Sequence, residues 1–226
     1  GVGGEKTLGI RIPVLRKLTK THRNDHELAS ALWASGIHEA RIIAPLIEDP
    51  ARVTERQADR WVRQFDSWDI CDLCCNNLLR KTPFAHDKAL EWSAGEREFV
   101  RRAGYVMMAV LAVHDKAAAD SVFAGYLRVV ASGATDERNM VRKAVNWALR
   151  QIGKRNLALN GKAITVISEN GPDVTILQGD GNATVVTIGL GNDVDVELRR
   201  HVAERGDVRR EAARVAGVER HDLAAR

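Results

Sequence analysis

Apolar and polar residues recur with a helical period from Pro13 to about residue 160, and capping residues mark where the segments begin and end. Asp25, Thr54 and Ser67 each precede an amphipathic segment, and Gly36 follows one. Pro13 suits the first turn of a helix. The pattern predicts helices over residues 13–22, 25–35 and 37–48, a helix that begins at 54, and helices over 67–81, 82–95, 96–115, 118–132 and 136–155.

These helices are short, the loops between them are tight, and no strand-like alternation interrupts them. Such a succession is typical of an α-solenoid, in which helix pairs stack side by side. We therefore expect an all-α fold, with a compact helical bundle as the alternative. The sequence has no crisp repeat motif, so the repeats are inferred from the order of the helices.

The pattern changes after residue 160. Residues 173–177 and 183–188 have the composition of two β-strands, separated by a glycine-rich turn, and residues 195–217 predict a helix with a ragged apolar face. The pattern offers these strands no further strand to pair with, so we expect at most a small β-hairpin. The sequence thus divides into a helical domain, residues 1–165, and a divergent tail, residues 166–226.

Composition indicates a soluble globular protein of about one domain. The 226 residues are 45% hydrophobic and 28% charged, and no run of 18 apolar residues or signal peptide is present. Cys71, Cys74 and Cys75 crowd into five residues, which is a poor disulfide framework and favours a reducing compartment. We expect a cytoplasmic monomer without a membrane segment.

The charge is uneven along the chain. Lys and Arg number 34 against 30 Asp and Glu, which gives +4 overall, and residues 1–160 hold 25 of the basic and 19 of the acidic residues. A basic helical part suggests a polyanionic partner such as a nucleic acid. A plain solvated surface explains the excess equally well.

The predicted helix over 136–155 has two distinct faces. One is an apolar stripe at i, i+4, i+7 and i+11: Val141, Val145, Ala148 and Ile152. The same spacing two residues later, about 200° around the helix, holds Lys143, Trp147, Arg150 and Lys154. A tryptophan among three cations favours stacking or nucleic-acid binding. The alternative is that Trp147 packs against a neighbouring helix.

A second candidate is the pair Trp68 and Asp72, which lie one turn apart on a single helix face. An indole ring beside a carboxylate can stabilise a developing cation, and the carboxylate can also orient a water. Asp69 points about 100° away from Trp68. The alternative is that Trp68 belongs to the core and Asp72 caps a helix or pairs with an arginine.

Three other groups carry weaker signals. Arg101, Arg102 and Tyr105 suggest a basic spot on the helix over 96–115, with an apolar face that ends at Val113. The cysteine cluster resembles half of a zinc site, but no second ligand pair lies at the right spacing, so buried thiols are favoured and no metal is expected. The glycines near the strands do not form a dinucleotide-binding loop.

Four motifs, taken together and in order, resemble one known family. They are Leu8-Gly9-Ile10-Arg11-Ile12-Pro13-Val14-Leu15-Arg16, Ser67-Trp68-Asp69-Ile70-Cys71-Asp72, Phe99-Val100-Arg101-Arg102-Ala103 and Val141-Arg142-Lys143-Ala144-Val145-Asn146-Trp147-Ala148-Leu149-Arg150. Over residues 8–165 the chain resembles the DNA alkylation repair (AlkD-like) glycosylases, whose fold is a HEAT-like α-solenoid. The last motif is the most specific of the four.

The resemblance implies hydrolysis of the N-glycosidic bond of cationic N3- and N7-alkylated purines, as in 3-methyladenine and 7-methylguanine, on duplex DNA held by a basic concave surface. It places Asp72, Trp68 and Trp147 around the sugar and Arg102 on the DNA. With the basic stripe, the expected DNA-binding residues are Arg102, Lys143, Arg150 and Lys154. No metal or cofactor is implied.

Two further helices before Gly9 are also implied, so we expect a chain that is truncated at its N-terminus. Two alternative functions stay open. One is a non-catalytic nucleic-acid-binding solenoid, which would not need Asp72 and both tryptophans together. The other is a protein-interaction solenoid, against which the excess of positive charge argues.

Overall fold

The computed structural model describes residues 6–155, together with the backbone of five short strands between residues 158 and 200. The chain divides into two compact units, Gly1–Arg155 and Asn156–Arg226. No helix in the described part of the chain is long and apolar enough to cross a membrane.

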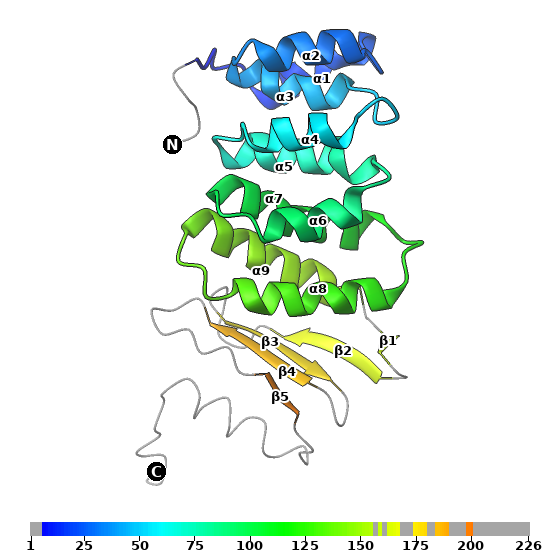
Figure 1. Ribbon diagram of the computed structural model, residues 1–226, viewed down its shortest axis with the longest axis vertical. Coiled ribbons are helices and arrows are strands. Elements are labelled where there is room, and N and C mark those ends of the chain that lie inside the picture. Colours follow the sequence, from blue (N-terminus) through cyan, green and yellow to red (C-terminus); the bar gives the residue numbers. More distant parts are fainter. Residues whose placement is uncertain are drawn as a thin grey trace, which may run out of the picture. The chain divides into compact units, whose positions relative to one another are not determined.

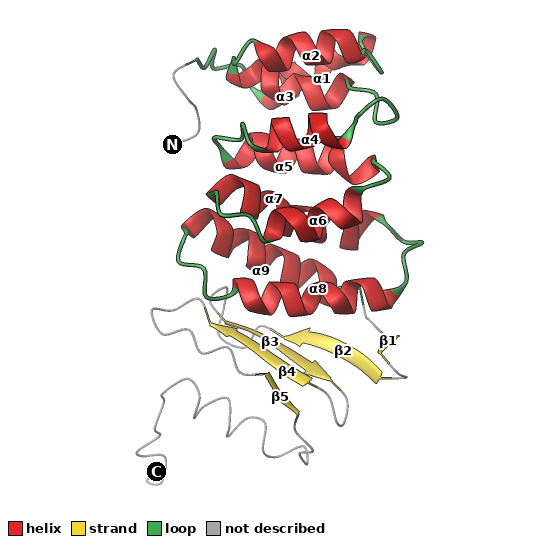
Figure 2. Ribbon diagram, in the orientation of Figure 1, coloured by secondary structure: helices red, strands yellow, loops and turns green. Residues whose placement is uncertain are grey.

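The first unit is helical, which confirms the predicted fold class (Figures 1 and 2). Within residues 6–155 its nine α-helices are α1 (Ile12–Leu18), α2 (His26–Ala34), α3 (His38–Ile47), α4 (Glu55–Val62), α5 (Trp68–Asn77), α6 (Ala85–Ser93), α7 (Glu98–His114), α8 (Asp120–Gly133) and α9 (Asn139–Gly153). Two 3₁₀ turns, Thr19–Thr21 and Leu79–Lys81, follow α1 and α5. The predicted helices over 13–22 and 67–81 therefore each end in a 3₁₀ turn.

The helices stack in pairs, and the second helices of the pairs, α3, α5, α7 and α9, form one row in which each contacts the next. All four run in the same direction, because contacts join their first turns to one another. His38 on α3 pairs with Asp69 on α5, and Glu98 on α7 accepts a hydrogen bond from the backbone N–H of Met140 on α9. This row therefore has an amino-terminal edge, at the first turns of its helices, and a carboxyl-terminal edge, at their ends.

Helix α7 is the centre of the core. Every residue from Arg102 to Ala112 is buried, because α7 is enclosed by α5, α6, α8 and α9. The expectation of a basic surface spot with Tyr105 was wrong, since Tyr105 is fully buried. Val113, expected in the core, is 39% exposed at the end of the helix.

Gly104 allows α6 and α7 to approach each other closely. A Cβ atom at this position would lie 2.2 Å from the backbone nitrogen of Ser93 and 2.8 Å from the carbonyl oxygen of Ala89. Backbone atoms cannot move aside cheaply, so only glycine fits here. This contact fixes the position of α7, which carries Arg102.

The predicted caps are confirmed at two helices. A side-chain oxygen of Asp25 accepts the backbone N–H of Leu28 at 3.0 Å, and the hydroxyl of Thr54 accepts that of Gln57 at 3.2 Å. Ser67 occupies the predicted cap position of α5, but its hydroxyl makes no cap hydrogen bond. The carboxylate of Asp69 instead accepts the N–H of Ile70 at 3.0 Å.

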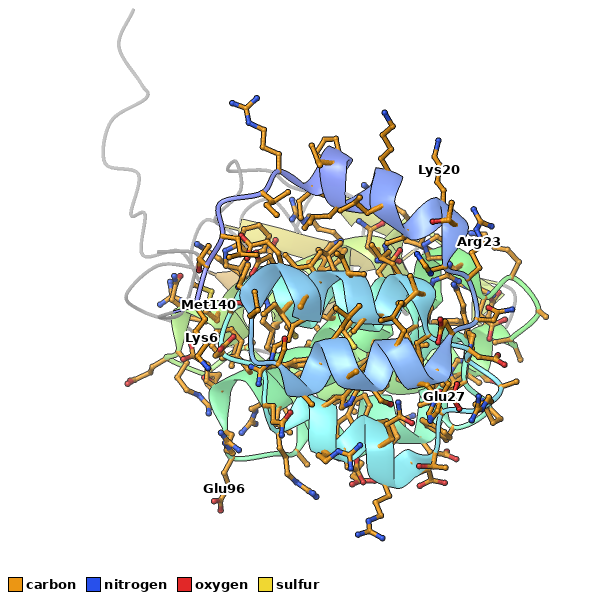
Figure 3. All side chains as sticks on the ribbon, turned by 90° about the horizontal axis from the view of Figure 1, so that it is seen from above. Lys6, Lys20, Arg23, Glu27, Glu96 and Met140 are labelled. Carbon is orange, nitrogen blue, oxygen red and sulfur yellow. The ribbon has the colours of Figure 1, made fainter. Side chains whose placement is uncertain are left out.

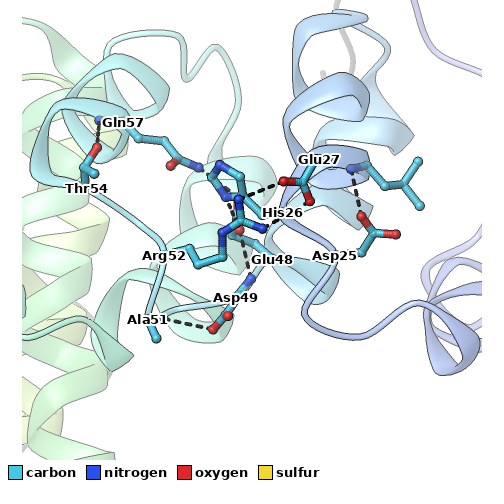
Figure 4. Close-up of polar contacts among 10 residues, drawn as sticks. Asp25, His26, Glu27, Glu48, Asp49, Ala51, Arg52, Thr54 and Gln57 are labelled. Carbon is cyan, nitrogen blue, oxygen red and sulfur yellow. Dashed lines mark hydrogen bonds and ion pairs between the residues drawn. The ribbon is translucent and has the colours of Figure 1, made fainter.

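A buried carboxylate ties the first two helix pairs together at the carboxyl-terminal edge (Figure 4). The carboxylate of Glu48 lies 2.8 Å from a ring nitrogen of His26 on α2 and accepts a hydrogen bond from the side chain of Gln57 on α4, also at 2.8 Å. Close by, Arg52 donates two hydrogen bonds to the carboxylate of Glu27. These contacts set the spacing between α2–α3 and α4.

The described part of the second unit is an antiparallel sheet of five strands in the order β1 (Ala158–Leu159), β2 (Lys162–Ile167), β3 (Val174–Gly179), β4 (Thr184–Gly189) and β5 (Leu198–Arg200). The predicted hairpin corresponds to β3 and β4, in which Val174 pairs with Gly189.

Two expectations for this part of the chain were wrong. The hairpin was expected to lack a further strand, yet β2 pairs with β3 and β5 pairs with β4. A helix was predicted from residue 195, but residues 198–200 form a strand because β4 offers them backbone partners. The rest of that predicted helix lies outside the described residues.

Candidate nucleic-acid interface

Trp68 and Asp72, which were predicted to share a helix face, lie in the first turns of α5. Trp68 is the first residue of α5 and is 43% exposed, so it does not belong to the core. Asp72 follows one turn later on the same face, and its side chain is 20% exposed. The surface at the amino-terminal edge therefore presents an accessible indole ring next to a mostly buried carboxylate.

Asp72 is held by an arginine from the next helix of the row. Arg102 on α7 donates from Nε to Oδ1 of Asp72 at 3.0 Å and from Nη2 to Oδ2 at 2.8 Å. Its Nη1 donates to the carbonyl oxygen of Met140 on α9 at 2.5 Å. All three guanidinium nitrogens of Arg102 are thus engaged inside the protein.

Arg102 was expected to contact DNA, but its guanidinium group is directed into the protein. The residue is only 5% exposed, and it joins α5, α7 and α9 rather than presenting a free charge. The alternative in which Asp72 pairs with an arginine is the arrangement observed. Arg102 is therefore placed to orient Asp72.

Burial and the neighbouring Arg102 act in opposite directions on the ionisation of Asp72. Burial raises the pKa of Asp72 above its usual range, and the hydrogen bonds and charge of Arg102 offset only part of that rise. A carboxylate has about four lone-pair positions, and Arg102 uses two of them. Asp72 can therefore still accept a hydrogen bond from a water molecule or stabilise a neighbouring positive charge.

Sequence reasoning missed a second contact to a carboxylate at the same edge. His38, buried at the start of α3, lies 2.9 Å from Oδ2 of Asp69 through its Nε2 atom. α5 is therefore bound on one side by His38 to α3 and on the other side by Arg102 to α7. No local pattern marked His38, because its partner lies 31 residues away.

Sequence reasoning also missed Glu39, which anchors the chain segment before α1. Its buried carboxylate accepts hydrogen bonds from the consecutive backbone N–H groups of Leu8, Gly9 and Ile10, the shortest of them 2.7 Å. Gly9 has a φ of +74°, which brings these groups to one side. Burial works to raise the pKa of Glu39, but these amide hydrogen bonds outweigh it, and the pKa lies below its usual range.

The two faces predicted for α9 are present. The apolar stripe is buried, and opposite it Trp147 is half-buried while the three cations Lys143, Arg150 and Lys154 are exposed. Helix α7 lies between α5 and α9, so Trp147 is not on a helix adjacent to Asp72. Within residues 6–155 neither Trp68 nor Trp147 stacks on another aromatic ring.

The cysteines are free and buried, as expected. Burial raises the pKa of all three thiols, which makes them poor nucleophiles and poor metal ligands. The ring of His86 contacts the Tyr126 hydroxyl and the carboxylate of Asp115. No group of three or more potential metal ligands occurs in the described part of the chain.

The sequence profile of one family, described as DNA alkylation repair enzyme, matches residues 3–178. The chain belongs to this family. The match includes all four motifs that carried the resemblance. No curated protein matches the chain in sequence.

A solved structure shares the fold of this DNA alkylation repair family member. It represents a protein family described as related to the HEAT-like repeat DNA glycosylases, with affinity for branched DNA structures. The two chains are 22% identical, with a TM-score of 0.61 over 74% of this chain and 76% of that one. At this level of identity the likeness establishes the HEAT-like fold alone.

Proposed function

We propose that this protein is a DNA glycosylase that hydrolyses the N-glycosidic bond of cationic N3- and N7-alkylated purines in duplex DNA. The observation that carries the proposal is the exposed Trp68 ring one turn from the Asp72 carboxylate, which Arg102 orients from α7. Membership of the DNA alkylation repair family supports the same conclusion.

The chemistry requires little beyond these groups. An alkylated purine is already positively charged, so it leaves without a general acid. The C1′–N bond breaks, its electron pair neutralises the purine ring, and positive charge develops on the sugar. Asp72 stabilises that charge and accepts a hydrogen bond from the attacking water, whose oxygen bonds to C1′ and whose proton passes to the carboxylate or solvent.

The aromatic residues add to this stabilisation through their ring faces. A cation over an exposed indole gains about 0.5–1 kcal/mol, and more as water is excluded. Trp68 lies beside Asp72, and Trp147 lies in the basic stripe of α9. We assign both to the sugar of the damaged nucleotide, and Lys143, Arg150 and Lys154 to DNA phosphates.

Release of N7-methylguanine from alkylated duplex DNA tests the proposal, with Asp72→Asn as the variant. Asparagine keeps the shape but loses the charge, and loss of one such group commonly lowers a rate by roughly 10²–10³. Affinity for unmodified duplex should be unchanged. The proposal would be wrong if both proteins released N7-methylguanine at the same rate, or if the unaltered protein released none.

A second function is favoured by one observation. Arg102 neutralises the charge of Asp72 with two hydrogen bonds, which weakens the field available to a sugar cation. A non-catalytic DNA-binding solenoid fits that neutralisation, and the structurally similar protein comes from a family with affinity for branched DNA. Binding of alkylated and branched duplexes without base release would favour this function.

A further inference from the structure

The carboxyl-terminal edge of the second-helix row carries basic side chains at three consecutive helices. Arg80 and Lys81 follow α5, His114 ends α7 and Lys116 comes just after it, and Lys154 follows α9. Arg155 fixes the end of α9 to that of α7, because its guanidinium donates to the carbonyl oxygens of Ala112 at 3.4 Å and Asp115 at 2.6 Å.

This edge lies across the row from the Trp68 and Asp72 site. Seen down the stack, Lys6 and Met140 lie on one side of the molecule, and Lys20 and Arg23 on the other (Figure 3). Met140 contacts Arg102 and so marks the amino-terminal edge. The ten residues of α5 separate the two edges by about 15 Å.

No carboxylate of the described residues pairs with these side chains. Among residues 6–155, none of Arg80, Lys81, His114, Lys116 and Lys154 takes part in an ion pair. Asp115 lies among them in sequence, but its carboxylate lies 2.9 Å from Nε2 of His86 and accepts the backbone N–H groups of Ala117 and Ala118.

The ionisation of these groups agrees with an excess of positive charge. Burial, and then the charge of Arg80, lower the pKa of Lys81. Burial, and then the charges of Arg80 and Lys116, lower the pKa of His114. The nearby charges that these groups experience are therefore of the same sign, which is unfavourable until an anion binds.

We propose that Arg80, Lys81, Lys116 and Lys154 form a phosphate-binding track for the backbone of duplex DNA along this edge. The proposal rests on the proposed DNA substrate and adds a second contact surface to it. Neighbouring helices of the row are about 8–10 Å apart, and phosphates of one strand rise by about 3.4 Å each. Cations on neighbouring helices are therefore far enough apart to contact separate phosphates of one strand.

The separation of the two edges suits a duplex that crosses α5. The distance of about 15 Å along α5 is comparable to the width of the major groove, about 12 Å. One backbone then lies near Trp68, where the damaged nucleotide reacts, and the other lies on the track. Binding through phosphates alone makes the track independent of base sequence.

A triple variant, Arg80→Gln, Lys81→Gln and Lys116→Gln, tests the track. Its matched control is Arg56→Gln, Arg60→Gln and Arg128→Gln, which removes three exposed cations from α4 and α8 and gives the same net charge. Affinity for unmodified duplex is measured over a range of salt concentrations. Each lost phosphate contact lowers the magnitude of the negative slope of log K against log salt by about 0.9. The magnitude should therefore fall by about 2–3 in the track variant and by little in the control.

Equal salt slopes for the track variant and its control would overturn the proposal. It would also be overturned if the track variant lost binding to anionic lipid vesicles while its salt slope for DNA stayed unchanged. Cations at helix ends also stabilise helices, so both variants are first checked for an unchanged melting temperature. Base release at saturating protein separates this test from the glycosylase proposal. If the unaltered protein releases no base but the slopes differ as expected, the track stands and the glycosylase fails.

Discussion

Arg102 on α7 binds both carboxylate oxygens of Asp72 on α5, at 3.0 and 2.8 Å, and the same guanidinium holds the Met140 carbonyl of α9. One arginine thus connects three successive helices of the row at the point where the candidate chemistry lies. Breaking a buried pair of this kind costs about 3–5 kcal/mol when one partner is removed. The conservative variants below are chosen to avoid that loss.

Arg102→Lys should move the acid side of the pH profile of base release to higher pH. Burial already raises the pKa of Asp72, and the two-pronged guanidinium limits that rise. Lysine cannot reproduce this geometry, so the pKa of Asp72 rises further and the ionised form is lost at higher pH as the solution is acidified. Single-turnover rates from acid to neutral pH measure the shift. Arg101→Lys is the control, and an identical acid side in the Arg102 variant would contradict the prediction.

Replacing either Trp68 or Trp147 with alanine should slow base release more than it weakens DNA binding. A ring stabilises a cation by about 0.5–2 kcal/mol, which corresponds to about a 2- to 30-fold loss in rate. Trp68→Phe should retain part of the rate because a ring face remains. Leu90→Ala, which removes an exposed apolar side chain from α6, is the control. Rates equal to that control would remove the tryptophans from the site.

Glu39→Gln should destabilise the protein at neutral pH and make it less sensitive to acid. The pKa of Glu39 lies below its usual range, so the stability that its carboxylate contributes is present above the ordinary pKa and is lost as pH falls through the lowered value. Glutamine cannot accept all of the hydrogen bonds from Leu8, Gly9 and Ile10, at a cost of about 1–3 kcal/mol. Urea unfolding at neutral and acid pH measures both effects, with the exposed Glu137→Gln as control. If the Glu39→Gln variant and its control lost the same stability on acidification, Glu39 would not be the group whose ionisation stabilises the fold.

Lys143→Ala and Arg150→Ala should each lower the magnitude of the negative slope of log K against log salt by about 0.9 for duplex DNA, because each removes one phosphate contact from the basic stripe of α9. Lys154→Ala should do the same through its place on this stripe and on the track. Arg128→Ala, on α8, should leave the slope unchanged. If one of these three substitutions leaves the slope unchanged, the residue that it replaces does not contact the DNA.

Gly104→Ala should lower the free energy of unfolding by at least about 1–3 kcal/mol, because its Cβ would overlap the backbone of Ser93 on α6. Gly125→Ala in α8 is the opposite case, since no atom lies within 4 Å of the added carbon. Alanine there should stabilise the helix by about 0.5–1 kcal/mol. Thermal or urea unfolding of both variants provides the measurement, and similar effects would refute the close approach of α6 and α7.

The sequence by itself determined the helical unit. Periodicity placed each helix, Asp25 and Thr54 capped the helices that they were expected to cap, and the face of α9 with Trp147 lies opposite its buried stripe. These features depend on residues a few positions apart, where spacing alone decides which side chains share a face. The family followed from motifs of the same local kind.

Only the tertiary structure decided how the site is assembled. Arg102 reaches Asp72 across 30 residues, His38 reaches Asp69 across 31, and Glu39 reaches the backbone of Leu8 across 31. Each of these contacts joins neighbouring layers of the stack, so it depends on how the helices pack, which no local pattern records. The sheet differs from prediction for the same reason: β2 and β5 pair with β3 and β4, and these pairings join separate segments of the chain.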